Sequence, residues 1–220
     1  AEEIGPALIA RLGDRLTAEL PAVCFPEDEE RLYTRLAGLK AAGLRELWTD
    51  NIYGVSLGRR LGLPVRGGFG LNIANERAAD FWREQGLLSL TLSFELPMTA
   101  VKRLGCGIPR GIAVYGRLPL MRFRNCPVRA GIGCAACGGH GTLRDRKGVV
   151  FPVECGERRY GTLLNSLPLD ILGREDPADF RLLWFTEEDP AECVRVLACA
   201  RQGESAAAER TGGLYYRKLL

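Results

Sequence analysis

The sequence lacks a long apolar run, and its first residues are not expected to be a cleavable leader. No apolar run reaches the roughly 18 residues that a membrane-spanning helix needs. The first residues, AEEIGPALIARLGDRL, carry acidic side chains and a helical spacing of leucines, whereas a signal peptide begins with a basic and then an apolar segment. These absences predict a cytoplasmic protein that does not cross a membrane.

Histidine is almost absent, which limits the hydrolytic chemistry that the chain can perform. A Ser-His-Asp or Cys-His enzyme would have to use the single histidine, His140. There is no H-E-x-x-H helix of a zinc protease, and GGFGLN lacks the G-x-G-x-x-G pattern of a phosphate-binding loop. The formal net charge is only +3, so the overall charge does not identify a partner.

Apolar runs and helical patterns alternate between Leu20 and Met121, which is typical of parallel β-structure with helical crossovers. The segment EDEERLYTRLAGLKAAG places Leu32, Leu36 and Leu39 on one helical face and ends at Gly43. Shorter helices are expected in GVSLGRRLG, NERAADFWREQG and PMTAVKRLG. The five expected strands are LPAVCF, LRELWTDN, PVRGGFGLNI, LLSLTLSFEL and GIAVYGRLPLM.

Five strands with four intervening helices predict an α/β fold: a partial TIM-like (β/α) barrel. A complete barrel needs about 250 residues, so we expect residues 1–121 to be the C-terminal half of one, with the other strands upstream. The segment before Leu20 is expected to be a helix. Residues 122–220 are expected to form a small cysteine-rich α+β region, with a hairpin turn at RDRKG and a last helix starting near Asp189.

Four of the eight cysteines lie close together in a segment rich in glycine and arginine. The spacing C-x7-C-x2-C-x17-C provides four thiolates, enough for tetrahedral zinc or for one 4Fe–4S cluster. The other four are scattered among apolar residues, as buried free cysteines usually are. His140 follows the third clustered cysteine, and we interpret it as a loop residue rather than a ligand. The predicted metal ligands are Cys126, Cys134, Cys137 and Cys155.

Polar residues follow the expected strands, where parallel barrels hold their functional groups. Glu95 comes after the buried run LLSLTLSF, and Arg124 lies just before the first clustered cysteine, so both are candidate catalytic residues. The candidate substrate-binding residues are Asp50, Asn72 and Arg122. Asn51 and Asn75 occupy similar positions, and for Asn75 a helix N-cap is the preferred interpretation.

The cysteine-rich segment is also basic. Residues 122–160 contain eight Arg or Lys side chains and three Asp or Glu side chains, a local charge of +5. This charge favours an anionic substrate or an RNA backbone as partner, and a solvated basic surface is the alternative.

Several motifs together resemble the peptidase U32 family, also called collagenase-like proteases. The most specific part runs from Tyr115 to Leu169 and contains VYGRLPLM, RNCP, C-x2-C, DRKG-x2-FP-x2-C and LLNSLPLD. GGFGLNIAN, LTLSFEL and the terminal TGGLYYRK extend the resemblance over roughly residues 45–217.

The resemblance implies a TIM-like barrel whose cysteines bind an iron–sulfur cluster. For the activity, the resemblance implies one of three enzymes. The first hydroxylates a pyrimidine of tRNA or ribosomal RNA with prephenate, and the second hydroxylates ubiquinone without oxygen. The third is a collagen-degrading peptidase. Shorter members of the family have a wider last cysteine interval and no close Cys-x2-Cys pair, so zinc remains an alternative metal. A zinc-stabilised binding module without chemistry of its own is the remaining interpretation.

Overall fold

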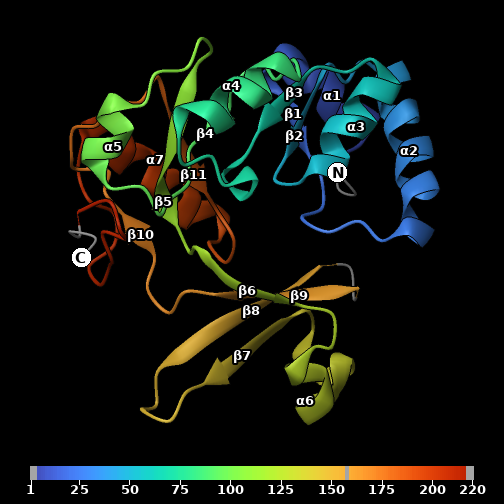
Figure 1. Cartoon of the computed structure of the whole chain (residues 1–220). Helices are drawn as coiled ribbons and strands as arrows, with labels where there is room; N and C mark the ends of the chain where they lie inside the picture. Colours follow the sequence, from blue (N-terminus) through green and yellow to red (C-terminus); the bar gives the residue numbers. More distant parts are fainter. Residues whose placement is uncertain (1–3, 157–158, 217–220) are drawn as a thin grey trace. The chain divides into compact units, whose positions relative to one another are not determined.

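The computed structural model describes residues 4–156 and 159–216, which form two compact units (Figure 1). The first unit contains the described residues of 1–112 together with 177–181. The second contains 113–156, 159–176 and 182–216. No helix in the described part of the chain is long and apolar enough to cross a membrane.

The first unit is an α/β structure with a partial TIM-like barrel, as the alternating pattern predicts. Five parallel strands pair in chain order, and a helix follows each of the first four. The strands are β1 (Thr17–Glu19), β2 (Glu46–Thr49), β3 (Val65–Gly67), β4 (Leu90–Thr91) and β5 (Arg110–Gly116), which continues into the second unit. The helices are α2 (Pro26–Ala41), α3 (Ile52–Leu61), α4 (Glu76–Glu84) and α5 (Met98–Arg103).

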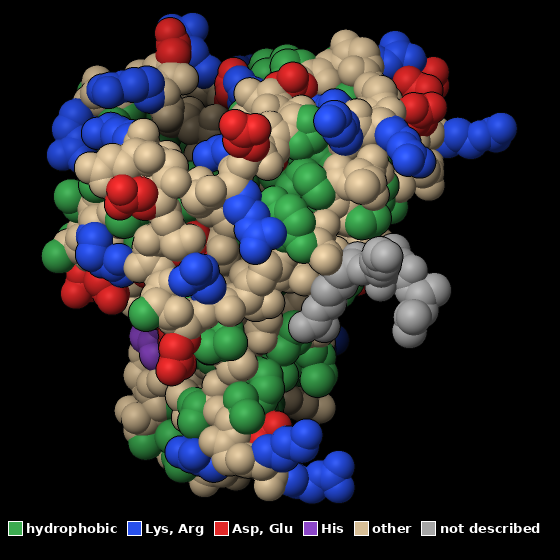
Figure 2. All heavy atoms as spheres, turned by 90° about the vertical axis from the view of Figure 1, so that its left-hand side faces the viewer, with side chains coloured by type: hydrophobic (Ala, Val, Ile, Leu, Met, Phe, Trp, Pro, Cys, Tyr) green, Lys and Arg blue, Asp and Glu red, His purple; other side chains and the backbone are tan. Residues whose placement is uncertain are grey.

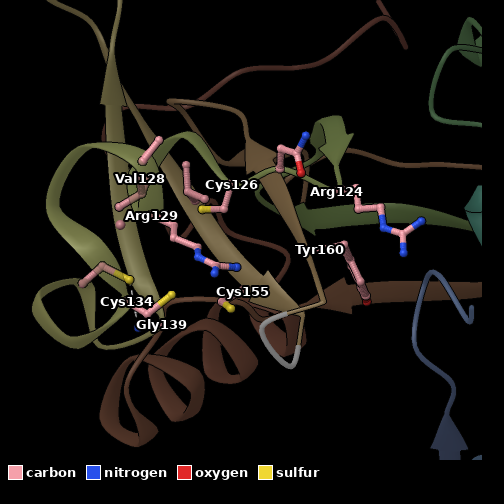
Figure 3. Close-up of a pocket in the computed structure, with 13 residues that line it drawn as sticks. Arg124, Cys126, Val128, Arg129, Cys134, Gly139, Cys155 and Tyr160 are labelled. Atoms are coloured by element: carbon pink, nitrogen blue, oxygen red, sulfur yellow. Dashed lines mark hydrogen bonds between the residues drawn. The ribbon is translucent and has the colours of Figure 1, made fainter. Parts of the chain in front are cut away.

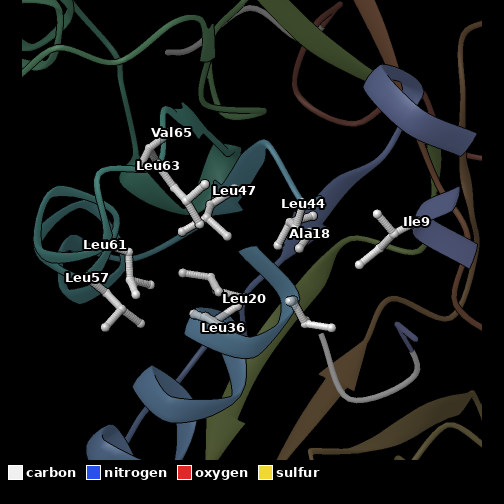
Figure 4. Close-up of a cluster of buried hydrophobic side chains, with 11 residues drawn as sticks. Ile9, Ala18, Leu20, Leu36, Leu44, Leu47, Leu57, Leu61, Leu63 and Val65 are labelled. Atoms are coloured by element: carbon white, nitrogen blue, oxygen red, sulfur yellow. The ribbon is translucent and has the colours of Figure 1, made fainter. Parts of the chain in front are cut away.

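One face of this sheet packs against α2 and α3. Leu36 of α2 and Leu47 of β2 are fully buried in a cluster that also contains Leu57 and Val65 (Figure 4). Each such side chain contributes about 1.5–3 kcal/mol by leaving water. A Cβ at Gly58 would lie 2.2 Å from a Val65 methyl carbon, so only glycine lets α3 approach β3 this closely.

The structure corrects the expected start of the barrel. The helix expected up to Leu20 ends earlier, because α1 (Pro6–Leu12) stops at Gly13, whose φ of 53° breaks the helical geometry. The η1 turn (Gly13–Arg15) leads into β1, and the expected strand LPAVCF is irregular. The strand lies slightly upstream of LPAVCF because Thr17–Glu19 pair with the start of β2, a contact that local sequence does not encode.

The second unit contains an antiparallel sheet in the order β6-β9-β8-β7. The strands are β6 (Pro119–Phe123), β7 (His140–Arg144), β8 (Val150–Gly156) and β9 (Tyr160–Leu164), with α6 (Pro127–Cys137) before β7. The unit also holds β10 (Leu169–Asp170), most of β11 (Phe180–Trp184) and α7 (Pro190–Gln202). The run GIAVYGRLPLM is therefore two strands, because Gly116 has a φ of 128° and β6 pairs in a different sheet.

Two local motifs of this unit agree with the sequence patterns. Asp189 and Glu192 form the reciprocal hydrogen bonds of a capping box at the start of α7. Asp145 closes the turn of the β7–β8 hairpin, because its carboxylate accepts hydrogen bonds from the backbone N–H groups of Lys147 and Val149.

Asp170 is a buried carboxylate that holds the chain after α7 in place. Its two oxygens accept hydrogen bonds from the backbone N–H groups of Leu172, Ala206 and Ala207, and the residue is only 4% exposed. Replacing Asp170 by Ala would leave these donors without their acceptor. We expect a loss of about 3 kcal/mol in the free energy of unfolding, measured by urea denaturation. Asp170→Asn, which keeps one acceptor oxygen, should lose less; equal losses would contradict this account.

Candidate metal centre

The four clustered cysteines line one pocket in the second unit (Figure 3). The pocket has a volume of about 420 Å³ and lies between α6 and the antiparallel sheet. Its other lining residues include Arg124, Asn125, Arg129 and Tyr160. None of its described lining residues is an Asp or a Glu.

Helix α6 supplies three of the cysteines. Cys126 is its N-cap residue, and Pro127 starts the helix with the φ that a first helical turn requires. Gly133 interrupts the helix with φ 79° and ψ 158°, so Cys134 and Cys137 belong to a separate last turn. The Cys-x2-Cys pair therefore lies in a helical turn that ends at Gly138.

Strand β8 supplies the fourth cysteine. Cys155 pairs with Gly161 of β9, close to the end of β8. The helix packs onto the neighbouring strand β7 through a glycine: a Cβ at Gly141 would lie 2.6 Å from a methyl carbon of Val128. Because α6 packs closely against the sheet, Cys155 shares one pocket with cysteines that lie 18 or more residues earlier in the chain.

The thiols fit a metal by their chemistry, but their present arrangement is not a closed single-ion site. In the part of the chain that the structure describes, no group of three or more His, Cys, Asp or Glu side chains is grouped tightly enough to hold one metal ion. Zinc needs four sulfur atoms at about 2.3 Å from one point. A 4Fe–4S cluster instead takes each thiolate at a different iron atom, so its four ligands lie farther apart around a larger volume.

The remaining cysteines do not line this pocket. Cys106 and Cys193 are half-buried and donate weak hydrogen bonds to backbone carbonyl oxygens of Ile108 and Glu188. Cys24 and Cys199 are also half-buried. The sequence predicts these four cysteines to be buried, whereas they are only partly buried, as the four pocket cysteines are.

His140 belongs to β7 rather than to a loop, and its side chain is exposed; it is the purple side chain in Figure 2. It pairs across the strands with Glu154 and does not line the pocket. The pKa of Glu154 is raised, mainly because the side chain is buried. The nearby charges of His140 and Arg122 lower this pKa, and the charge of Glu187 raises it. Glu154 and Cys155 are consecutive in β8, so they point to opposite faces of the sheet.

The two arginines before Cys126 differ in their positions. Arg122 lies in β6 opposite Thr162 and is exposed, and it does not line the pocket. Arg124 lines the pocket at its rim, and its guanidinium points away from the cysteines in Figure 3. Sequence analysis missed Arg129 and Tyr160; the signal for Arg129 was its position one helical turn after Cys126.

The polar residues of the first unit lie in turns and caps. Asp50 is 9% exposed and accepts a hydrogen bond of 2.8 Å from the backbone N–H of Gly70, which fixes the loop after β3. Asn72 is exposed, with a left-handed φ of 51°. Asn75 caps α4 by accepting from the backbone N–H of Ala78, as preferred from the sequence. Glu95 is exposed in the turn after β4.

Comparisons with protein-family models, with curated proteins and with solved structures found no match. The assignment of a function therefore depends on the residues and geometry of this chain and on the sequence motifs quoted above.

Proposed function

We propose that this chain binds a 4Fe–4S cluster through Cys126, Cys134, Cys137 and Cys155 and belongs to an enzyme that hydroxylates an RNA base. The observation that carries the proposal is the common pocket of four cysteines from two different elements. Four half-buried thiols line this pocket beside Val128 and Val153, and together they provide the donor set that a thiolate-bound metal needs. Thiols of this kind remain reduced in the cytoplasm, the compartment that we propose.

The pocket favours a cluster over zinc. Its volume of about 420 Å³ exceeds what one ion needs, and no three candidate ligands of the described residues are grouped tightly enough for one ion. Four thiolates around a cavity match the four iron corners of a cluster. Zinc binding by the same thiols, with a purely structural role, is the alternative that metal analysis would reveal.

The hairpin β7–β8 supports RNA as the partner. Arg144, Arg146 and Lys147 are exposed on its turn, and Asp145 uses its carboxylate to close that turn. Such a group of cations binds phosphates without reading sequence. A second proposed partner, besides RNA, is the upstream half of the barrel. It would pair with β1, which is the end strand of the first unit's sheet among the described residues.

Metal and RNA analysis test the proposal directly. Protein purified without oxygen should contain about four iron and four sulfide ions per chain and show the broad visible absorbance of a cluster. Mass spectrometry of RNA nucleosides from cells that lack the protein should show the loss of one hydroxylated pyrimidine. Zinc without iron would favour the binding module, and cleavage of denatured collagen would favour a peptidase.

Reversing two charges on the hairpin should weaken RNA binding. For Arg144→Glu with Arg146→Glu, we expect an affinity for tRNA at least tenfold lower at 100 mM salt. The slope of log affinity against log salt should also become shallower by about two, because each lost phosphate contact reduces the size of this slope by roughly 0.9. The matched control is Arg31→Glu with Arg35→Glu on α2, which should change neither quantity. Binding that does not depend on salt would contradict this role.

A further inference from the structure

Arg129 places an exposed positive charge at the edge of the cysteine pocket. The residue lies in the first half of α6, one turn after Cys126, and lines the pocket. In Figure 3 its side chain extends from the helix toward those of Cys126 and Cys155. Within residues 4–156 and 159–216, the Arg129 side chain makes no ion pair or hydrogen bond.

The guanidinium of Arg129 is exposed to solvent, so its partner is sought among the groups that line the pocket. No described residue of the pocket lining carries a carboxylate. The groups that become negative there are the cysteines, since a metal binds them as thiolates. Zinc or an oxidised 4Fe–4S cluster with four thiolates carries a net charge of about −2, and a cation beside the thiolates offsets part of that charge.

Resting on the proposed function, we infer that Arg129 is the positioning residue that compensates the charge of the four-thiolate centre. Its guanidinium offers several N–H donors in a fixed plane, which suits hydrogen bonding to sulfur ligands. A reduced cluster is one unit more negative than an oxidised one, so the cation stabilises the reduced form more. Arg129 therefore raises the reduction potential and strengthens metal binding.

The test compares Arg129→Gln, Arg129→Lys and the control Arg77→Gln in the full chain, reconstituted anaerobically with iron and sulfide. A redox titration followed by electron paramagnetic resonance should give Arg129→Gln a more negative potential than the unchanged protein. Arg129→Lys, which keeps the charge, should recover much of the difference. Arg77→Gln, at an exposed position in α4, should leave the potential unchanged.

Metal affinity provides a second measurement that needs no redox chemistry. Chelator competition with zinc should show affinity about tenfold lower for Arg129→Gln, as expected for one lost cation near the ligands. If zinc binds and no cluster forms, the proposed enzyme function fails while this measurement still decides the role of Arg129. An unchanged potential and an unchanged zinc affinity in Arg129→Gln would overturn the inference, as would failure of the four cysteines to bind either metal.

Discussion

Replacing any one of Cys126, Cys134, Cys137 and Cys155 by serine should remove most of the bound metal. Each cysteine is a proposed ligand that lines the same pocket, and a serine hydroxyl is a poor substitute for a thiolate. We expect the iron content of anaerobically purified protein to fall from about four ions per chain to less than one. Iron, sulfide and zinc analysis of each variant measures the effect.

The control for this experiment is a half-buried cysteine outside the pocket. Cys199 lies in α7, and Cys199→Ser changes the same atoms as the four ligand variants. It should keep its full metal content. Equal metal loss in Cys199→Ser, or full metal content in Cys155→Ser, would show that the pocket is not the binding site.

The alternation of strands and helices was predictable because each segment carries its own signal. Leu36 and Leu39 form a helical stripe in sequence, and both are buried in the structure. The first strand was misplaced because Thr17–Glu19 have little apolar character of their own and gain their extended form by pairing with β2. Long-range pairing of this kind leaves no local pattern.

The candidate site was only partly predictable for a similar reason. The spacing of the cysteines identified the donors, but the pocket depends on the packing of α6 against β7 through Val128 and Gly141. The helical form of the Cys-x2-Cys turn depends on the positive φ of Gly133. A glycine can adopt a positive φ, but its presence in the sequence does not show that it does so. Arg129 became a candidate only when the helix placed it over the pocket.

Glu95→Gln should lower the activity of the full-length protein by about 10²- to 10⁴-fold, the usual contribution of a general acid or base. Glu95 follows β4, at the end of the parallel strands where barrel enzymes hold their functional groups. Its side chain is exposed, and its backbone N–H donates a 3.3 Å hydrogen bond to the hydroxyl of the buried Ser93, which fixes the turn. The carboxylate is thus held at an accessible position.

The measurement is the recovery of the hydroxylated base in RNA from cells that lack the protein and carry each variant. Glu95→Gln keeps the size of the side chain and removes its charge, so its melting temperature and metal content should match those of the unchanged protein. Glu76→Gln is the control, because Glu76 is also exposed but lies at the start of α4. If Glu95→Gln melts early or loses metal, the carboxylate has a structural role. If base hydroxylation is normal, Glu95 takes no part in catalysis, and the proton must be handled by another group of the barrel.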